Sequence, residues 1–563
     1  MMQTFECLQK DIINLHCSSV EVSSDSDTLP VGAVRPVQEL DAEHHLVVGI
    51  HPGEQEPPAA VKVTAGERAQ GLIRGLKLIL QHHGISREAM DSFQTQATVY
   101  LTCDDETVFF KRAKYLTVAP MARYLRCEAP KQPDLAWKPI GQYRNWANAR
   151  LRVFNRKNTH LWYSFLQGKR SALPLSDDLV LTTYEEHRAA MEIKDPIDDK
   201  THDSVMKELR PVLKKIRKTL QRKYDTSVRE DDWLSPVETH SVASTSASYE
   251  KSRAAGGQLG ALIRHVPTLY QCNPLNRTDV RKTPDLCRMT FYPRVVISGV
   301  VQFNVVIEEY CYASGEEEWY ESIRKGCVRY AEKQLTLKAT IQAVLEPLKV
   351  RVISKGNAAP YYASKRLQKS LHDVIREMDC FRLVGAPLQA VDLYDLALNP
   401  VELGDGQLEW FSIDYSAATD KLSARLSASI LGYLIEGQDE GMQNMWRAVL
   451  APHLCEYPET SGTTVPPVQQ VNGQLMGSIL SFPILCLANL GLYLETIKED
   501  KRSLNKKLKG VLVNGDDMLY VAPQSLWPKH VENGAKVGLT MSPGKAYHHP
   551  VYANANSACY HFD

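Results

Sequence analysis

Hydrophobic patterns typical of helices and of strands divide the chain. Residues 66–84, GERAQGLIRGLKLILQHHG, have apolar positions at helical spacing and predict an amphipathic helix that ends at Gly84. Residues 185–225 are also expected to be mostly helical. Residues 292–312 are rich in β-branched residues, and the break at Gly299 predicts a strand, a turn and a second strand.

A second pattern of this kind, VLVNGDDMLY, begins at Val511. Its apolar flanks, Val511–Val513 and Met518–Val521, are continuous, which predicts strands buried on both faces. The NGDD segment between them suits a tight turn, because Asn-Gly tolerates positive φ. We therefore expect a hairpin that holds two adjacent carboxylates, Asp516 and Asp517, at its tip.

The segment LEWFSI, Leu408 to Ile413, predicts another strand, with Asp414 at its end. Ser416 is expected to cap a helix that begins near Ala417. Asp420 would lie in the first turn of that helix, where the helix dipole alone favours an acid. An acid at the end of a strand projects beyond the sheet edge, where substrates bind in open sheets.

One segment resembles a membrane span. SILSFPILCLANLGLYL, Ser478 to Leu494, has 17 residues and carries Ser481, Pro483 and Asn489. A span needs about 20 apolar residues, so we expect a buried helix instead. Ser481 and Asn489 lie eight residues apart, near two helical turns, so both would face the same way.

Composition and charge fit a large globular protein with several sub-domains. The 563 residues are 44% hydrophobic and formally neutral, which argues against a nucleic-acid binder that uses its whole surface. Residues 1–60 hold ten acids and two bases, a net charge of −8 that predicts a solvated tail. The basic segment 207–223 is either a solvated helix face or a wall of an RNA channel. Residues 226–258 are polar and predict a linker or long loop.

Cysteine and histidine spacing gives no zinc signature. The twelve cysteines include no C-x-x-C pair, and the doublets His44-His45, His82-His83 and His548-His549 lack zinc-site spacing with cysteine. We therefore expect no structural zinc, and free thiols in a reducing compartment. No hydrophobic signal segment follows Met1, so no signal peptide is expected.

The acids suggest a metal site. Two adjacent anions repel, so a cation must lie near them or one acid stays protonated. Hard oxygen ligands on a rigid turn suit Mg²⁺. Asp414, Asp516 and Asp517 together would form a cage for two Mg²⁺ ions, with Mn²⁺ as a substitute, as in enzymes of in-line displacement at phosphorus. A solvated surface turn is the alternative for the hairpin alone.

A basic strand would complement these acids. KVRVISK, from Lys349 to Lys355, alternates, so a strand would place Lys349, Arg351 and Lys355 on one face. Three cations on one edge can neutralise a triphosphate and the charge on leaving pyrophosphate. A charged outer strand face is the simpler alternative.

The order of these features resembles that of a viral enzyme family. The basic strand, D-x5-D, GQLMGSILSFPILCLAN, NGDD and GLTMSPGKAY resemble motifs F, A, B, C and D of viral RNA-dependent RNA polymerases, most closely those of the ourmia-like and narnavirus group (Botourmiaviridae and Narnaviridae), positive-strand RNA viruses of fungi and plants. The resemblance covers about residues 345–563. YEKSRAAGGQ, residues 249–258, is similar to a stretch upstream of the catalytic motifs in these polymerases.

The resemblance implies a role for each matching residue. Asp414 and Asp516 match the metal-binding acids, and Asp517 the third acid close to the metals. Asp420, Ser481 and Asn489 match residues that sense the ribose 2′-hydroxyl, and Gly477 matches a flexible glycine near the nucleotide. Lys545 lies in the region of a lysine proposed to protonate pyrophosphate. The nucleotide-binding set is therefore Lys349, Arg351, Lys355, Asp420, Gly477, Ser481 and Asn489.

The implied fold is α+β: a right-hand polymerase of fingers and palm, with an antiparallel palm sheet flanked by helices. We expect a flexible acidic segment at 1–60, a mostly helical N-terminal or fingers region at 61–230, fingers at 231–344 and the catalytic core at 345–563. Asn556-Ser557 fits the start of motif E, and only a few residues follow. A very short thumb or a truncated chain is therefore expected.

The expected function is RNA-directed RNA polymerase, a nucleotidyltransferase that replicates a positive-strand RNA virus genome in the host cytoplasm. Its partners would be template and product RNA, NTPs and its own genomic RNA in a ribonucleoprotein, with no obligatory membrane anchor. One alternative is a reverse transcriptase, although Asp420, Ser481 and Asn489 suit a ribose hydroxyl. The other is a non-enzymatic RNA-packaging protein with an inactive palm.

Overall fold

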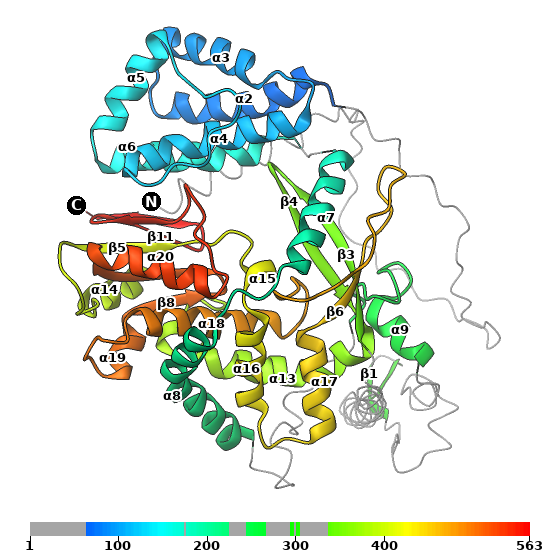
Figure 1. Ribbon diagram of the computed structural model, residues 1–563. Helices are drawn as coiled ribbons and strands as arrows, with labels where there is room; N and C mark the ends of the chain where they lie inside the picture. Colours follow the sequence, from blue (N-terminus) through cyan, green and yellow to red (C-terminus); the bar gives the residue numbers. More distant parts are fainter. Residues whose placement is uncertain are drawn as a thin grey trace.

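The computed structural model describes residues 63–173, 176–224, 244–265, 293–297, 300–303 and 336–562 (Figure 1). The acidic segment 1–60 and residues 226–243 of the predicted linker lie outside the described residues. The predicted strand pair near Gly299 is present, because β1 (Pro293–Ile297) and β2 (Val300–Phe303) are antiparallel with Ile297 opposite Val300.

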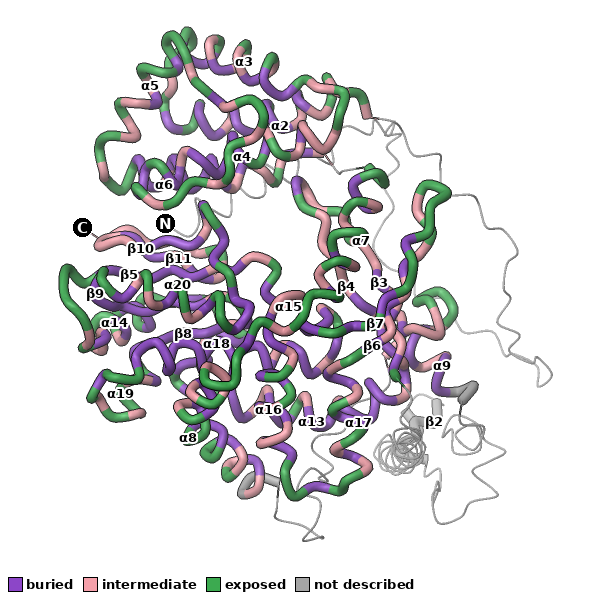
Figure 2. Tube along the Cα trace, viewed as in Figure 1, coloured by how far each residue is buried: buried purple, intermediate pink, exposed green. Residues whose placement is uncertain are grey.

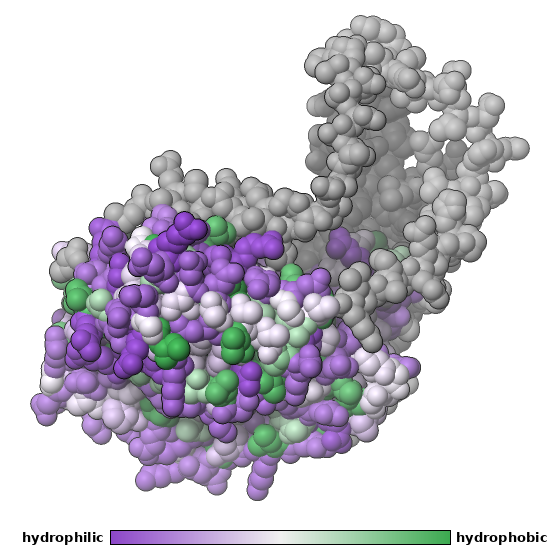
Figure 3. Space-filling model, turned by 90° about the horizontal axis from the view of Figure 1, so that it is seen from above, coloured by the Kyte–Doolittle hydropathy of each residue, from purple (hydrophilic) through white to green (hydrophobic). Residues whose placement is uncertain are grey.

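The N-terminal part is a layer of helices. It contains α2 (Ala65–His82), α3 (Arg87–Leu101), α4 (Glu106–Leu125), α5 (Gly141–Arg152), α6 (Arg156–Gln167) and the 3-10 helix η1 (Gly168–Ser171). The helix predicted at 66–84 is α2; Thr64 and Glu67 form a reciprocal capping box at its start, and Gly84 has φ of +70° just beyond its end. Figure 3 looks onto this layer from above and shows a mainly hydrophilic face with scattered hydrophobic side chains.

A small mixed sheet lies beside α7 (Asp177–Glu192) (Figure 1). Its strand order is β4-β3-β6-β7, formed by β4 (Lys349–Gly356), β3 (Leu337–Glu346), β6 (His453–Glu456) and β7 (Val468–Gln469). The predicted basic strand is therefore confirmed as β4. It is an edge strand paired antiparallel with β3; Lys349 is exposed, and Arg351 and Lys355 are half-buried.

A second sheet, entirely antiparallel, has the order β10-β5-β9-β8. It consists of β10 (Tyr547–His549), β5 (Leu408–Ile413), β9 (Asp517–Pro523) and β8 (Val511–Asn514). We call it the central sheet. With the helices around it, it gives the molecule the α+β architecture predicted from the sequence. β8 and β9 form the expected hairpin, and both are buried along almost their whole length.

Side-chain alternation assigns each residue of the central sheet to one of two faces. Phe411, Ile413, Met518 and Tyr520 join the large core beneath the sheet. Trp410, Leu519 and Val521 instead join a smaller core. That second face is covered by α14 (Ala390–Leu398) and by the hairpin of β11 (Tyr552–Ala555) and β12 (Ala558–His561).

The large core is built from helices around α18 (Ser481–Thr496). Almost every residue of α18 is buried, which confirms the prediction of a buried helix (Figure 2). No helix in the described part of the chain has the length and apolarity to cross a membrane. The other helices of this region are α8 (Asp199–Tyr224), α9 (Gly257–His265), α13 (Ala358–Arg376), α15 (Ala418–Lys421), α16 (Ala424–Ile435), α17 (Glu440–Leu450), α19 (Leu504–Lys509) and α20 (Trp527–Lys536).

The basic segment 207–223 belongs to α8, which is strongly amphipathic. Leu209, Leu213 and Ile216 pack into the large core, whereas Lys214 and Lys218 are exposed. This arrangement matches a solvated basic face. The RNA-channel alternative stays a prediction.

The predicted cap at Ser416 is wrong. Ala417 precedes α15 with φ of +51°, and no side chain caps this short helix. The Ser416 backbone N–H donates to Thr540 O at 2.8 Å instead, which ties the segment to the chain before β10. A side-chain cap appears only at the next helix, where Ser423 accepts the Leu426 N–H at 3.0 Å.

Candidate active site

The register of the central sheet brings two of the predicted acids together. β5 and β9 pair with Ile413 opposite Met518, so the next positions, Asp414 and Asp517, also face each other across the strands. Because Ile413 and Met518 point into the large core, alternation directs Asp414 and Asp517 to the opposite face. The pairing of two strands far apart in the sequence thus gathers two carboxylates at one end of the sheet.

Asp516 joins them through the turn between β8 and β9. Asn514 pairs with Asp517, which leaves Gly515 and Asp516 as the turn, and Gly515 has φ of +67°. The turn rests on α18: the Gly515 N–H donates to Cys486 Sγ at 3.2 Å, and Asn489 Nδ2 donates to Gly515 O at 3.0 Å. The hairpin tip is therefore held from beneath by a buried helix.

The three carboxylates influence one another electrostatically. Desolvation, then the negative charges of Asp516 and Asp414, raises the pKa of Asp517 to about 7. The pKa of Asp516 is also raised, first by desolvation and then by Asp414. Asp516 is exposed at the tip of the turn, close to the other two acids. Such crowding of acids is typical of a site that binds cations.

Two of the predicted lysines lie at this group of acids. Lys545 Nζ is 3.6 Å from Asp414 Oδ2, and a turn that begins with the Ser542 N–H donating to Asp414 O positions it. Lys349, at the start of β4, is close enough for its charge to counteract the raised pKa of Asp516. The structure therefore brings together Asp414, Asp516, Asp517, Lys545 and Lys349.

Arg351 and Lys355 are engaged within their own sheet. Arg351 Nε lies 2.9 Å from Glu346 Oε1, and Lys355 Nζ donates to Gln342 Oε1 at 2.9 Å. Both partners belong to β3, which pairs with β4. Alternation puts both cations on the same face of β4, as expected. These partners are residues of β3 and not the aspartates.

Ser481 and Asn489 are buried and bonded to the protein. Ser481 Oγ donates to Leu475 O at 3.0 Å, and Asn489 is completely buried. The Asn489 amide accepts from Tyr415 OH at 3.0 Å and donates to the turn carbonyls. This structure therefore gives both side chains a part in holding the backbone around the site, and it does not direct either of them at open space beside the acids.

Asp420 belongs to α15, and Gly477 lies against β4. Burial raises the pKa of Asp420 to about 6, and Thr419 Oγ1 donates to its carboxylate at 3.1 Å. A Cβ at Gly477 would lie 2.1 Å from Ser354 O, and its φ is +137°. Because Gly477 has no side chain, strand β4 can pack against its backbone. The resemblance instead implies a nucleotide near this glycine.

Sequence patterns missed two lysines of the helical layer. Lys114 on α4 and Lys169 on η1 both lie close enough to Lys545 and Asp414 to interact with their charges. Desolvation, then the neighbouring Lys545, lowers the pKa of Lys169 to about 8. Neither lysine lies in a recognisable motif, and both are more than 240 residues from Asp414 in the sequence. Only the packing of the layer over the central sheet reveals them.

The C-terminal hairpin also contributes to the site. The Asn556 backbone N–H donates to the Asp517 carboxylate, and Asn514 Nδ2 donates to Asn556 Oδ1 at 2.9 Å. Asn556 and Ser557 both have positive φ at the turn between β11 and β12. The turn that the sequence aligned with motif E therefore lies against the acid of the β8–β9 hairpin.

The donor set fits hard divalent cations, because carboxylate oxygens are the ligands that Mg²⁺ and Mn²⁺ prefer. The oxygens of the three aspartates are not all within 4.8 Å of one another. Among the residues that the structure describes, possible ligand atoms of His82, His83 and His160 do lie within 4.8 Å of one another. The aspartates therefore border a shared site rather than a closed single-ion cage.

Similarity to known proteins agrees with the expected resemblance. The chain is 28% identical over 477 residues to the RNA-dependent RNA polymerase of Ourmia melon virus (isolate Melon/Iran/VE9), a match that covers 79% of this chain and 51% of that protein. The chain thus spans about half the length of this relative. A shorter match, 29% identical over 102 residues, links 17% of the chain to a UPF0149 protein of Ectopseudomonas mendocina. No protein-family model matches the chain.

Among solved structures, the chain is similar to the RNA-dependent RNA polymerase of a human picobirnavirus and to its insertion-loop deletion mutant. The TM-score is 0.39 in both cases, at 11% and 12% identity, with 70% of this chain covered and 62% and 64% of those chains. A score of this size carries no argument by itself. The predicted resemblance to ourmia-like viral polymerases is confirmed by the sequence match.

Proposed function

We propose that the chain is an RNA-directed RNA polymerase that replicates the genome of a positive-strand RNA virus. One observation carries the proposal: the register of β5, β9 and β8 gathers Asp414, Asp516 and Asp517 at one end of the central sheet, beside Lys545. The sequence similarity to a viral RNA-dependent RNA polymerase supports the choice of RNA over other phosphate substrates.

The three aspartates would hold two Mg²⁺ ions, with Mn²⁺ as a substitute. When bound, such ions supply a lowered pKa at a 3′-hydroxyl and neutralise triphosphate charge. Burial first, and then repulsion from the neighbouring aspartates, raises the pKa of Asp516 and of Asp517, and bound cations would offset that repulsion. Asp414 and Asp516 are the metal-binding acids in this proposal, and Asp517 supports them.

The lysines around the aspartates would hold the triphosphate. Lys349, Lys114 and Lys169 approach the site from β4, α4 and η1, three different elements. The 3′-hydroxyl oxygen would form a bond to the α-phosphorus as the bond to pyrophosphate breaks, and the hydroxyl proton would pass to water. Lys545, 3.6 Å from Asp414, is placed to give a proton to the departing pyrophosphate.

The finer assignments belong to the same proposal. Template RNA, product RNA and NTPs are the partners, and the genomic RNA stays bound in a ribonucleoprotein. The host cytoplasm is the proposed location, in keeping with free cysteines such as Cys380, Cys455 and Cys486. Asp420, Gly477, Ser481 and Asn489 would support ribose selection by positioning backbone.

Substituting Asp516→Asn tests the proposal directly. The variant removes one negative charge from an exposed turn position and is expected to reduce nucleotide incorporation on an RNA template to background in Mg²⁺, with an unchanged circular dichroism spectrum. Asp405→Asn, an exposed acid in the loop before β5, is the matched control and should retain activity. Incorporation at the wild-type level by Asp516→Asn would refute the assignment.

Two further measurements separate the alternatives. A reverse transcriptase would incorporate dNTPs at least as well as NTPs, whereas we expect NTPs to be strongly preferred. RNA binding that is unaffected by Mg²⁺, with no synthesis under any condition, would favour the packaging protein.

A further inference from the structure

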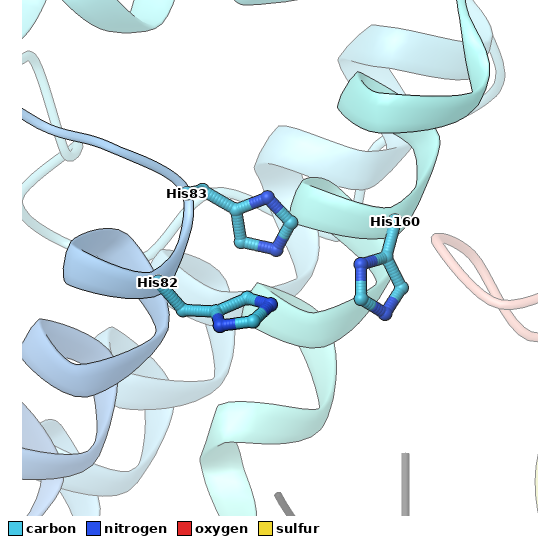
Figure 4. A group of neighbouring side chains, drawn as sticks. All are labelled: His82, His83 and His160. Carbon is cyan, nitrogen blue, oxygen red and sulfur yellow. The ribbon is translucent and has the colours of Figure 1, made fainter. Parts of the chain in front are cut away.

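Three histidines of the helical layer converge at a distance from the aspartates (Figure 4). His82 is the last residue of α2, His83 follows it, and His160 lies on α6. The ring centroids of His83 are 5.1 Å from those of both His82 and His160. Figure 4 shows the rings around one shared space between the end of α2 and α6.

The spacing of the ring nitrogens suits a metal ion after small side-chain rotations. One nitrogen from each histidine lies within 4.8 Å of the other two. A point at the centre of such a triangle is at most about 2.8 Å from each nitrogen, against about 2.0–2.1 Å for a zinc–imidazole bond. Each ring therefore has to move inward by less than about 1 Å, which χ rotation supplies without backbone change.

One of the three histidines, His83, has a buried ring nitrogen that makes no hydrogen bond. His83 is only 5% exposed, and its Nε2 is buried without a hydrogen-bond partner in the structure. A buried imidazole nitrogen of this kind is costly unless something binds it. Burial, then the neighbouring His160 and His82, lowers the pKa of His83 to about 3, so its imidazole is neutral at pH 7. Neutral imidazole is the form that binds metals.

The surroundings limit both the kind of ion and its affinity. Lys157 and Arg150 lie near enough to act on His83, and their positive charges oppose a further cation. Three imidazoles without a carboxylate suit borderline ions such as Zn²⁺, Co²⁺ or Ni²⁺, and not Mg²⁺. We therefore expect moderate, micromolar affinity at this site and no competition from magnesium.

We propose that His82, His83 and His160 form a binding site for one Zn²⁺ ion, or a similar transition-metal ion, which joins the end of α2 to α6. Sequence spacing predicted no zinc site, because His160 lies 77 residues beyond His83 and no cysteine accompanies either. Three histidine ligands would leave a fourth coordination position for water. Its structural effect is to fasten together two helices of the layer that carries Lys114 and Lys169.

The test uses the full-length protein, stripped with a chelator and returned to buffer with millimolar Mg²⁺. Titration with Zn²⁺ is expected to show one site per chain with a dissociation constant of about 10 µM or tighter. His82→Ala and His160→Ala should each weaken binding by at least about tenfold. His202→Ala is the matched control, since His202 is bonded to Asp203 and Ser429 outside the group, and it should bind Zn²⁺ as the wild type does.

A stability readout keeps the test decisive if one variant folds poorly. His82 is exposed, so His82→Ala should keep the wild-type unfolding temperature in the absence of zinc. Saturating Zn²⁺ should raise that temperature by a few degrees for the wild type and His202→Ala, but not for His82→Ala. Wild-type protein with no site tighter than about 100 µM, or His82→Ala that binds as tightly as the wild type, would overturn the proposal.

Discussion

At the scale of one residue, the Asp517 carboxyl lowers the stability of the folded protein at neutral pH. Its pKa is about 7 in the folded chain, well above the usual value of 3.8. The folded state therefore binds its proton more tightly than the unfolded state does, and stability is lost as the pH rises from about 4 to about 7. Below both values the carboxyl is neutral in both states and has no such effect.

Replacing this acid by its neutral isostere should therefore stabilise the metal-free protein. We expect Asp517→Asn to raise the free energy of unfolding at pH 8 by about 1–2 kcal/mol, after allowance for solvent screening. Near pH 4 the difference should vanish. Urea unfolding in the presence of a chelator, with Asp405→Asn for comparison, measures the stability difference at each pH. An equal stabilisation at pH 8 and at pH 4 would contradict the electrostatic origin.

Lys169 gives a second prediction at this scale. If it holds the triphosphate, Lys169→Met should raise the KM for NTPs by about tenfold, because one charge-assisted contact is lost. The exposed Lys131→Met is the control. An unchanged KM with a lower kcat would instead point to a positioning role for Lys169.

The residues differ in how far the sequence could predict them. Asp414 was predictable because it ends the apolar run Leu408–Ile413, and Asp517 because apolar runs flank the NGDD turn on both sides. Lys114 and Lys169 were not, since their place depends on how a distant helical layer packs. Ser416 was assigned a cap by residue type alone, whereas the left-handed conformation of Ala417 determines where the short helix begins.

At the scale of elements, the contact between α18 and the β8–β9 turn is the main support of the acids. Asn489 is the centre of this contact: it accepts from Tyr415 OH and donates to the carbonyls of Gly515 and Asp516. The resemblance implied ribose sensing for this residue. A completely buried amide with partners on both of its polar atoms acts through the turn that it holds.

Removing this amide should loosen the turn. Asn489→Ala removes the donor to the Gly515 and Asp516 carbonyls, while Tyr415 OH keeps its bond to His530 Nε2, and the loss is expected to cost about 1–3 kcal/mol of stability. The kcat for nucleotide incorporation should fall, because the aspartates of the β8–β9 hairpin shift. The KM for NTPs should change little, because the lysines lie on other elements and keep their positions. Thermal unfolding and steady-state kinetics measure the two effects. Ser92→Ala, at a half-buried position of α3 far from the site, is the control for a polar side-chain loss elsewhere.

The pattern of elements was more predictable than their contacts. Continuous apolar runs indicated β8, β9 and α18 as buried, and alternation indicated β4 as a strand. The order of strands in the central sheet could not be obtained from the same patterns, since β10 pairs with β5 across more than 130 residues of sequence. The resemblance implied an antiparallel sheet flanked by helices but no strand order, which comes only from the backbone pairing in the structure.

At the scale of the whole molecule, the helical layer and the central sheet meet at Phe154. Its ring stacks on Tyr124 at 4.7 Å and on His549 of β10 at 4.5 Å between centroids. It also stacks on His561 of β12. Tyr163 OH donates to Ser557 O nearby, at the turn beside Asp517. The layer that carries Lys114 and Lys169 is thus joined to the strands next to the acids.

Loss of the Phe154 ring should weaken both the stability of the fold and the position of the lysines at the site. We expect Phe154→Ala to lower stability by about 1–3 kcal/mol and to increase amide exchange in β10, β11 and β12, because stacked ring area is lost on both sides. The KM for NTPs should rise as it does in Lys169→Met, since the lysine then lies farther from Asp414. Val153→Ala, the exposed neighbour, should change none of these. A stable variant with unaltered exchange in the C-terminal strands would show that the layer is held in place by its other contacts.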